Sequence, residues 1–371
     1  MGGADVGRDP NREPGPTIGG LSLRLRGLGL AVIAGGFPVG NALGAGALIA
    51  LGGFVPVVGG WLDDRVTSWS DVVATLGGVC PSRVAGDPDA DHGPVLGRAD
   101  APELFDEVAA LARRAGARPP GQLRLSYLPC CGATAWGRRG RALLIGLPLL
   151  SVLTRIELRA VLAHELAHLA RGDATSVARS ARFVEALGRS LDASRTDRAR
   201  LSPLLGWARL CHAAGSALLA PIARGQETRA DRFAASVAGG DATASALVKV
   251  ALVQPLFREV LGHYRPDVSG GLTLYGYFRS FWRRLPEPLL TSMRHGLLSE
   301  LPARSDGAHP PLIDRLAVVQ SYSNRPPTEL DLEPAESVLG DPIALERMLH
   351  NRLFGPDTVP AGPSLFHRAG S

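Results

Sequence analysis

The chain has 371 residues, of which 45% are hydrophobic and 20% are charged, and its formal net charge is +5. That share of charged residues excludes a transporter built mostly of membrane spans, and the scattered arginines give no support for nucleic-acid binding. The four cysteines are too few and too unevenly spaced for a disulfide framework. The composition therefore fits a globular domain with a membrane-facing part.

The first 62 residues divide into a polar tail and a hydrophobic segment. Residues 1–26 are rich in Gly, Pro, Asp and Arg, and we expect a disordered tail there. No charged residue occurs in residues 27–62, which is longer than the ~20 residues that cross a bilayer as a helix. Because Pro38 and Pro56 interrupt this stretch, it is predicted to be one membrane span or a hairpin, with a buried Gly/Ala-rich hairpin as the alternative.

The orientation of this segment depends on the number of spans. Arg24 and Arg26 precede it and favour a cytoplasmic N-terminus. One span would place the rest of the chain outside, whereas a hairpin would keep it in the cytoplasm. We expect a protein of a bacterial-type cell membrane with its main domain facing the cytoplasm. Leu201 to Ile222 is a further candidate membrane or interfacial element.

After a linker at 63–94, residues 95–325 are predicted to form the main domain. Pro102 to Ala115 has the apolar spacing of a helix, and the short apolar runs Leu123 to Tyr127 and Leu143 to Leu147 predict a β-hairpin. Most of the chain after Leu149 is predicted to be helical, including a C-terminal helical extension and tail at 326–371. The expected fold class is mainly α with a small β-hairpin or sheet, an α+β arrangement.

A helix that begins near Thr154 carries the run His164-Glu165-Leu166-Ala167-His168. Thr154 and Glu157 have the spacing of a capping box, and Gly172 is a candidate end. Two histidines four residues apart project from one helix face, so His164 and His168 are predicted to bind one tetrahedral cation. The adjacent Glu165 is placed to accept a proton from a zinc-bound water and to pass it to a leaving amine.

Glutamate is a common third ligand for such a pair of histidines, and Glu227 lies in an Ala-rich helical stretch. Asp231 lies one turn further on the same face. Glu227 is therefore predicted to bind the metal, while Asp231 orients a ligating histidine and fixes its tautomer. A solvated acidic helix face is the alternative for these two residues.

These motifs resemble those of the HtpX-like and CAAX-prenyl-protease family of membrane zinc metallopeptidases. The resemblance covers approximately residues 101–316. It depends on three segments that occur in the family's order: Ala160 to Asp173 around the His164 motif, Glu227 to Ala235, and His309-Pro310-Pro311 followed by Asp314-Arg315-Leu316.

The resemblance implies a mainly helical gluzincin fold with one zinc ion on His164, His168 and Glu227. It also implies that Glu165 is the general base and that Asp231 supports the metal ligands. His309 and Arg315 are implied to lie over the active site, where they would hold substrate or the tetrahedral intermediate. By sequence alone, a His before two prolines is only a loop residue.

The chain departs from the family in one place, because Gly132-Ala133-Thr134-Ala135-Trp136 lacks the Asn-Ala pair that members usually carry in the hairpin before the catalytic helix. The sequence therefore does not assign substrate contacts to this hairpin, although a strand near Leu143 to Gly146 is expected to pair with an extended peptide. The neighbouring Cys130 and Cys131 are given no role, with metal binding or oxidation as the alternative.

The predicted function is that of a membrane-associated zinc endopeptidase acting on membrane or misfolded proteins, with the lipid bilayer as its other partner. The alternatives are a catalytically inactive or chaperone-like membrane protein that retains a structural zinc site, and a deformylase-like metallohydrolase. The latter needs a cysteine ligand in a motif that Cys130 and Cys131 do not match.

Overall fold

The computed structural model describes residues 25–33, 36–37, 93–136, 140–170, 183–184, 186–188, 191, 203–266, 271–299, 310–324 and 326–355. The chain divides into two compact units, residues 1–84 with 174–222 and residues 85–173 with 223–371. The disordered tail was expected over residues 1–26, but Leu25 and Arg26 are helical, so the prediction is wrong for these two residues. The rest of that tail and most of the 27–62 membrane segment lie outside the described residues, as do Gly172, Asp173 and His309.

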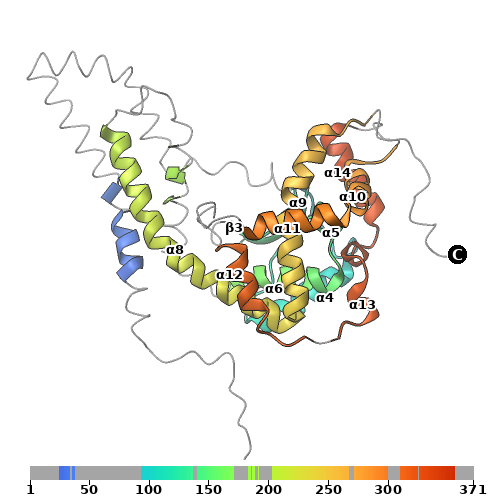
Figure 1. The fold of residues 1–371 in the computed structure, drawn as a ribbon, viewed down its shortest axis with the longest axis horizontal. Coiled ribbons are helices and arrows are strands. Elements are labelled where there is room, and N and C mark those ends of the chain that lie inside the picture. The colour runs from blue at the N-terminus through green and yellow to red at the C-terminus, as the bar shows by residue number, and fades with distance from the viewer. Residues whose placement is uncertain are drawn as a thin grey trace, which may run out of the picture. The chain divides into compact units, whose positions relative to one another are not determined.

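The larger unit contains a four-stranded sheet and the helices that cover it (Figure 1). The strands are β1 (Val95–Leu96), β2 (Gln122–Ser126), β3 (Cys131–Trp136) and β4 (Gly140–Gly146), in the order β1-β2-β4-β3. The mainly helical fold with a small sheet confirms the coarse prediction.

The arrangement of the strands differs from the predicted hairpin. The apolar runs of β2 and β4 are parallel neighbours, with Leu123 opposite Leu143, and the antiparallel partner of β4 is β3. The prediction missed β3 because its Gly, Ala and Thr residues lack the apolar alternation of a half-buried strand. With β2 on one side and β3 on the other, β4 has no free edge, so the expected pairing of Leu143 to Gly146 with a peptide is wrong.

The helices of the larger unit follow the sheet in the chain, except for α4 (Pro102–Ala115), which has the predicted bounds. Their order is α5 (Leu147–Leu150), α6 (Arg155–Ala170), α8 (Pro203–Ala238), α9 (Gly240–His263), α10 (Leu274–Arg284), α11 (Glu287–Ser299), α12 (Leu312–Val319), α13 (Glu329–Leu332), the 3-10 helix η4 (Ala335–Val338) and α14 (Pro342–Phe354).

Helix α6 lies at the centre of the larger unit and packs against α4, α9 and β3. Its buried leucines Leu158, Leu162 and Leu166 join the main hydrophobic core, to which the sheet, α4, α9 and α10 also contribute. On another side, Ala160 packs with Ala238 and Ala246, because small side chains let the helices approach closely. The helix is therefore held by packing along its length.

The corner between α8 and α9 is made of two glycines. Gly239 has φ of 93°, a conformation that favours glycine. A Cβ atom on Gly240 would lie 2.6 Å from the carbonyl oxygen of Val319 and 2.8 Å from that of Tyr322. The amide of Asp241 donates to the Asn324 side chain at 2.8 Å. This corner therefore fits tightly against the chain that follows α12.

The smaller unit includes helical residues 25–33 and the first part of α8, which share a core of Leu30, Phe37, Phe183, Val184, Leu187, Ala208, Cys211 and Ile222. The Phe37 and Phe183 rings meet edge to face at 5.4 Å. Among the described residues, no helix is both long and apolar enough to cross a bilayer.

Candidate metal centre

Helix α6 presents His164 and His168 one turn apart on one face. Their Nε2 atoms are 3.2 Å apart and their rings meet edge to face. The start of the helix has half of the predicted capping box, since the Thr154 amide donates to the Glu157 carboxylate at 2.7 Å. The same carboxylate accepts from Ser245 and Lys249 of α9, which fastens the helix before it reaches the histidines.

Glu227 of α8 faces the two histidines. Its Oε2 lies 3.5 Å from Nε2 of His164 and its Oε1 lies 3.4 Å from Nε2 of His168. Three ligands bound tetrahedrally at 2.0–2.1 Å have a mutual spacing of about 3.3 Å. The nitrogen and carboxylate donors are of the types that zinc accepts, and the three residues form a group that could hold a metal ion.

Asp231 lies one turn after Glu227 and is almost fully buried. Its Oδ1 is 3.0 Å from Nδ1 of His164, so the carboxylate can accept the Nδ1 proton and leave Nε2 directed at the metal group. Burial by itself lowers the pKa of His164, but the hydrogen bonds to Asp231 and Glu227 outweigh burial and raise it to about 9. The surroundings of His164 therefore favour positive charge, whether a proton or a metal ion.

Arg315 of α12 binds both oxygens of the Asp231 carboxylate through one edge of its guanidinium, with Nε donating to Oδ2 at 2.9 Å and Nη2 to Oδ1 at 2.8 Å. Burial raises the pKa of Asp231, but Arg315 and His164 together hold it below its ordinary value. Nη2 of Arg315 also lies 3.5 Å from Oε2 of Glu227. Sequence reasoning assigned Arg315 to substrate, whereas its shortest contacts are with Asp231.

Glu165 is half-buried on α6 between the two histidines in sequence. Burial chiefly raises the pKa values of the Cys130 and Cys131 thiols, and the negative charge of Glu165 raises both further. Helix α6, which carries Glu165, packs on β3, the strand that begins at Cys131. A raised pKa favours the protonated thiol, which is the less reactive form.

The structure thus brings together His164, His168, Glu227, Asp231 and Arg315 from three helices. His309 lies outside the described residues. Sequence reasoning did not find that Glu157 binds Lys249 and Ser245. No local signal marks these partners, because they lie 92 and 88 residues away along the chain.

Comparison of the sequence with known proteins identifies a family. The model of Peptidase family M48 matches residues 98–323, which is more than half of the chain. Protease HtpX of Acinetobacter baylyi (strain ATCC 33305 / BD413 / ADP1) is 28% identical over 258 residues, which cover 63% of this chain and 78% of that protein. The Protease HtpX homolog of Acidiphilium cryptum (strain JF-5) is 28% identical over 250 residues, with coverages of 63% and 79%.

A shorter similarity involves Protease HtpX of Acinetobacter baumannii (strain AYE), which is 30% identical over 164 residues, or 40% of this chain and 54% of that protein. No solved structure matches the chain. The family match contains all three residues of the metal group and Asp231 and Arg315 besides. The chain belongs to Peptidase family M48 and is an HtpX-like metallopeptidase.

Proposed function

We propose that the chain is a membrane-associated zinc endopeptidase that holds one zinc ion on His164, His168 and Glu227. The observation that carries the proposal is the mutual spacing of 3.2–3.5 Å among three donor atoms of the types that zinc prefers. When bound, zinc supplies a Lewis acid that polarises the scissile carbonyl and lowers the pKa of water.

Glu165 is the proposed general base. It is the residue after His164 on α6, so the helix that positions the two histidine ligands also positions its carboxylate. It accepts a proton from the attacking water as a general base and then donates it to the leaving amine as a general acid. Asp231 holds the tautomer of His164 in this scheme, and Arg315 holds Asp231.

His309 and Arg315 are also proposed to contact the substrate or the tetrahedral intermediate. Nη2 of Arg315 lies 3.5 Å from Glu227 and from His164, so its positive charge acts on the metal group as well as on Asp231. A cationic group in this position favours the negative charge that develops on the carbonyl oxygen.

The proposed substrate is an extended stretch of a membrane or misfolded protein that pairs with β3. Among the described strands it is the last in the sheet order, and it packs on α6, the helix that carries Glu165. The backbone of an edge strand pairs with an extended peptide without regard to its side chains. Pairing of this kind suits a protease that acts on unfolded chains of many sequences.

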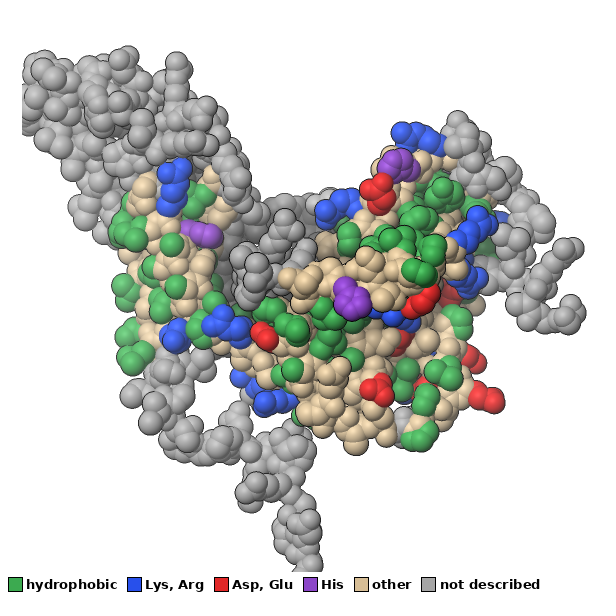
Figure 2. All heavy atoms as spheres, in the orientation of Figure 1, with side chains coloured by type: hydrophobic (Ala, Val, Ile, Leu, Met, Phe, Trp, Pro, Cys, Tyr) green, Lys and Arg blue, Asp and Glu red, His purple; other side chains and the backbone are tan. Residues whose placement is uncertain are grey.

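Exposed apolar side chains of the smaller unit support the membrane association. Leu25, Leu28 and Val32 are each about 60% exposed or more, and Trp207 and Leu210 of α8 are also exposed. Figure 2 shows hydrophobic side chains gathered over this part of the molecule. An exposed apolar surface with an aromatic residue suits contact with lipid.

Replacing Glu165 with Gln tests the proposed chemistry. We expect one zinc ion per chain in both wild type and variant, and a loss of cleavage of an unfolded polypeptide by about 10²–10⁴-fold, because the variant lacks the proton acceptor. Glu329→Gln, which removes an exposed carboxylate, should cleave like wild type. Equal activity of wild type and Glu165→Gln would end the proposal. Zinc binding without cleavage by wild type would favour the structural-zinc alternative.

Fractionation tests the proposed membrane association. Deleting residues 1–62 removes the uncharged segment together with Leu25, Leu28 and Val32. We expect this deletion to shift the chain from the membrane pellet to the supernatant, because most of the apolar anchor is lost. Unchanged retention in the pellet would assign membrane contact to another part, with Trp207 and Leu210 as the first residues to replace.

A further inference from the structure

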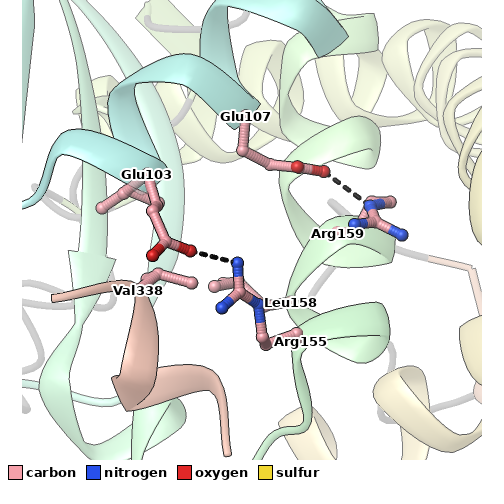
Figure 3. A pocket seen from close by; sticks show the side chains of 7 residues that line it. Glu103, Glu107, Arg155, Leu158, Arg159 and Val338 are labelled. Carbon is pink, nitrogen blue, oxygen red and sulfur yellow. Dashed lines mark hydrogen bonds and ion pairs between the residues drawn. The ribbon is translucent and has the colours of Figure 1, made fainter. Parts of the chain in front are cut away.

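Two arginines lie in the first turns of the catalytic helix α6. Positive charge near a helix N-terminus is unfavourable because it opposes the helix dipole. Arg155 and Arg159 are nevertheless one turn apart on one face, and Glu103 and Glu107 are matched to them on the facing helix α4 (Figure 3). Nε of Arg159 donates to Glu107 at 2.6 Å. The two arginines therefore join α6 to α4 and do not stabilise α6 by itself.

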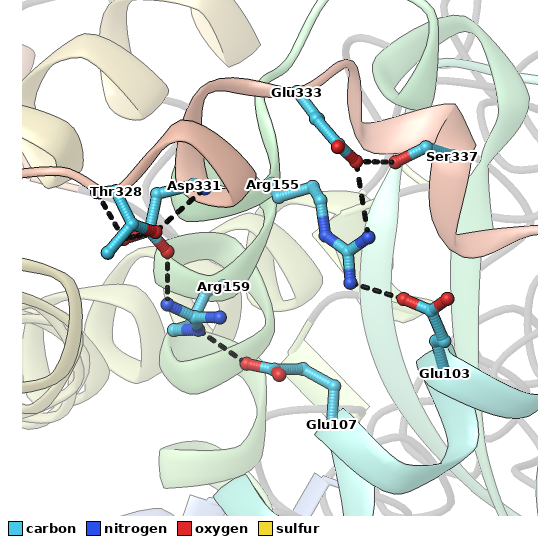
Figure 4. Close-up of polar contacts among 8 residues, drawn as sticks. All are labelled: Glu103, Glu107, Arg155, Arg159, Thr328, Asp331, Glu333 and Ser337. Atoms are coloured by element: carbon cyan, nitrogen blue, oxygen red, sulfur yellow. Dashed lines mark hydrogen bonds and ion pairs between the residues drawn. The ribbon is translucent and has the colours of Figure 1, made fainter.

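Each arginine also binds the C-terminal segment, here residues 326–355. Arg159 Nη1 donates to Asp331 Oδ1 at 2.8 Å, and Arg155 Nη1 lies 3.5 Å from Glu333 Oε2 (Figure 4). The main chains pair at the same place, because the Arg155 amide donates to the Glu333 carbonyl at 2.9 Å and the Ala335 amide to the Leu153 carbonyl at 2.8 Å. The C-terminal segment thus caps a free amide at the start of the catalytic helix.

The ion pairs of Arg155 and Arg159 differ in how exposed their side chains are to solvent. The side chains of Glu103 and Glu333 are 58% and 48% exposed, so water weakens their attraction to Arg155. The side chains of Arg159 and Asp331 are 23% and 4% exposed. Asp331 is itself fixed, because it accepts from both the amide and the hydroxyl of Thr328 in a capping box. The Arg159–Asp331 contact is therefore the stronger and more rigid of the two.

The Arg159–Asp331 contact is on the same helix as the metal ligands His164 and His168. His164 follows Arg159 by five residues, which is a rise of about 7.5 Å along a rigid helix. A small rotation or slide of α6 at Arg159 would move His164, Glu165 and His168 together. Glu227 would stay behind, because it belongs to α8. Metal geometry tolerates shifts of only a few tenths of an ångström.

We propose that Asp331, acting through Arg159, is a positioning residue for the peptidase reaction, so that the C-terminal segment sets where the metal ligands and general base of α6 lie relative to Glu227. This inference rests on the proposed function for its chemistry. It goes beyond it by assigning a role in the active site to a segment that lies outside the family match at residues 98–323.

Steady-state kinetics of the full chain test this role, with Asp331→Asn beside the matched control Glu329→Gln on the same short helix. At a temperature where both are folded, we expect Asp331→Asn to lower kcat about tenfold with KM within twofold of wild type, because misplacement by less than an ångström weakens the chemical step more than binding. The exposed Glu329 should not matter. Asp331→Glu, which keeps the negative charge, should recover part of kcat.

A second readout uses cobalt in place of zinc, so that it needs no turnover. The visible spectrum of cobalt(II) depends on the geometry of its ligands. We expect a changed spectrum in Asp331→Asn and none in Glu329→Gln. Arg159→Met with Asp331→Asn should change kcat no more than the more severe single variant, because the two residues act as a unit.

The proposal is overturned if Asp331→Asn has the kcat and cobalt spectrum of wild type, or if kcat falls only in proportion to the unfolded fraction measured by circular dichroism. Failure of the proposed function itself is distinguishable. In that case wild type would not cleave, whereas the cobalt spectra would still report whether Asp331 positions the ligands.

Discussion

The two halves of helix α6 use charge in opposite ways. In the first half, Arg155, Arg159 and Glu157 each meet partners of opposite charge. In the second half, Nε2 of His164 and Nε2 of His168 lie 3.5 and 3.4 Å from the Glu227 carboxylate. These distances are long for hydrogen bonds and leave room for a metal ion between the three groups. Ion pairs therefore fix the first half of the helix, whereas the second half brings donor atoms together where a metal ion can bind.

Removing one of the groups that face the metal position should have the largest effect. Glu227→Gln should reduce bound zinc from one per chain to near zero and lower kcat/KM by about 10³-fold or more, because the third ligand loses its charge. Metal analysis and cleavage assays measure both losses. The fold should survive, since this half of the helix is also held by packing. Full zinc content in the variant would contradict the ligand assignment.

Removing a paired group should instead damage stability. Lys249→Met leaves the buried Glu157 carboxylate without its cation and should lower the free energy of unfolding by about 3 kcal/mol. Chemical denaturation measures the loss. The double variant Glu157→Gln with Lys249→Met should recover much of it, because no buried charge is then left. A single variant as stable as wild type would show that Ser245 and Thr154 suffice for Glu157.

Asp231 has two partners, because it forms an ion pair with Arg315 and also contacts His164 of the metal group. Asp231→Asn should lower metal affinity or activity by about 10–100-fold, because an amide is a poorer acceptor for the Nδ1 proton. Competition with a zinc chelator measures the affinity. The exposed neighbour of Arg315 in α12, Asp314, offers the control Asp314→Asn. An equal effect of both substitutions would point to net charge instead of the contact with His164.

The smallest effect concerns pH. Burial raises the pKa of Asp331, but Thr328 and Arg159 outweigh it and lower the pKa to about 2. A carboxyl group with a depressed pKa stabilises the fold above its unfolded pKa of about 4, and this contribution disappears as the pH falls towards 2. Asp331→Asn should therefore cost about 1–2 kcal/mol at pH 7 and much less near pH 2.5.

Urea unfolding of the metal-free chain at several pH values measures this difference. The exposed pair of Arg98 and Asp106 is the control, since Asp106→Asn should change stability by less than about 0.5 kcal/mol at any pH. A loss for Asp331→Asn that is as large at pH 2.5 as at pH 7 would assign the effect to packing.

Local patterns were enough to predict several parts of the molecule. The spacing of Leu104, Val108 and Leu111 predicted α4, and the Thr154 and Glu157 spacing predicted the start of α6. The histidine pair was visible because four residues make about one helical turn, and the family relationship was suggested by the resemblance of three short segments. All of these signals act within a few residues.

Contacts between distant residues could not be read in the same way. Arg315 lies 84 residues from Asp231, and Asp331 lies 172 residues from Arg159. The parallel pairing of β2 with β4 also depends on β3, whose small residues give no strand signal. Such contacts depend on how the helices and strands pack, and no pattern within one segment specifies that packing.

The glycine corner at Gly239 and Gly240 has a consequence for protein engineering. It joins the end of α8, the helix of Glu227 and Asp231, to the start of α9, which lies against the carbonyls of Val319 and Tyr322 at the end of α12, the helix of Arg315. A methyl group at position 240 would have to push the start of α9 away from the end of α12. In a library of variants selected for proteolysis, position 240 should therefore tolerate as few substitutions as a metal ligand, although it has no side chain and takes no part in the chemistry.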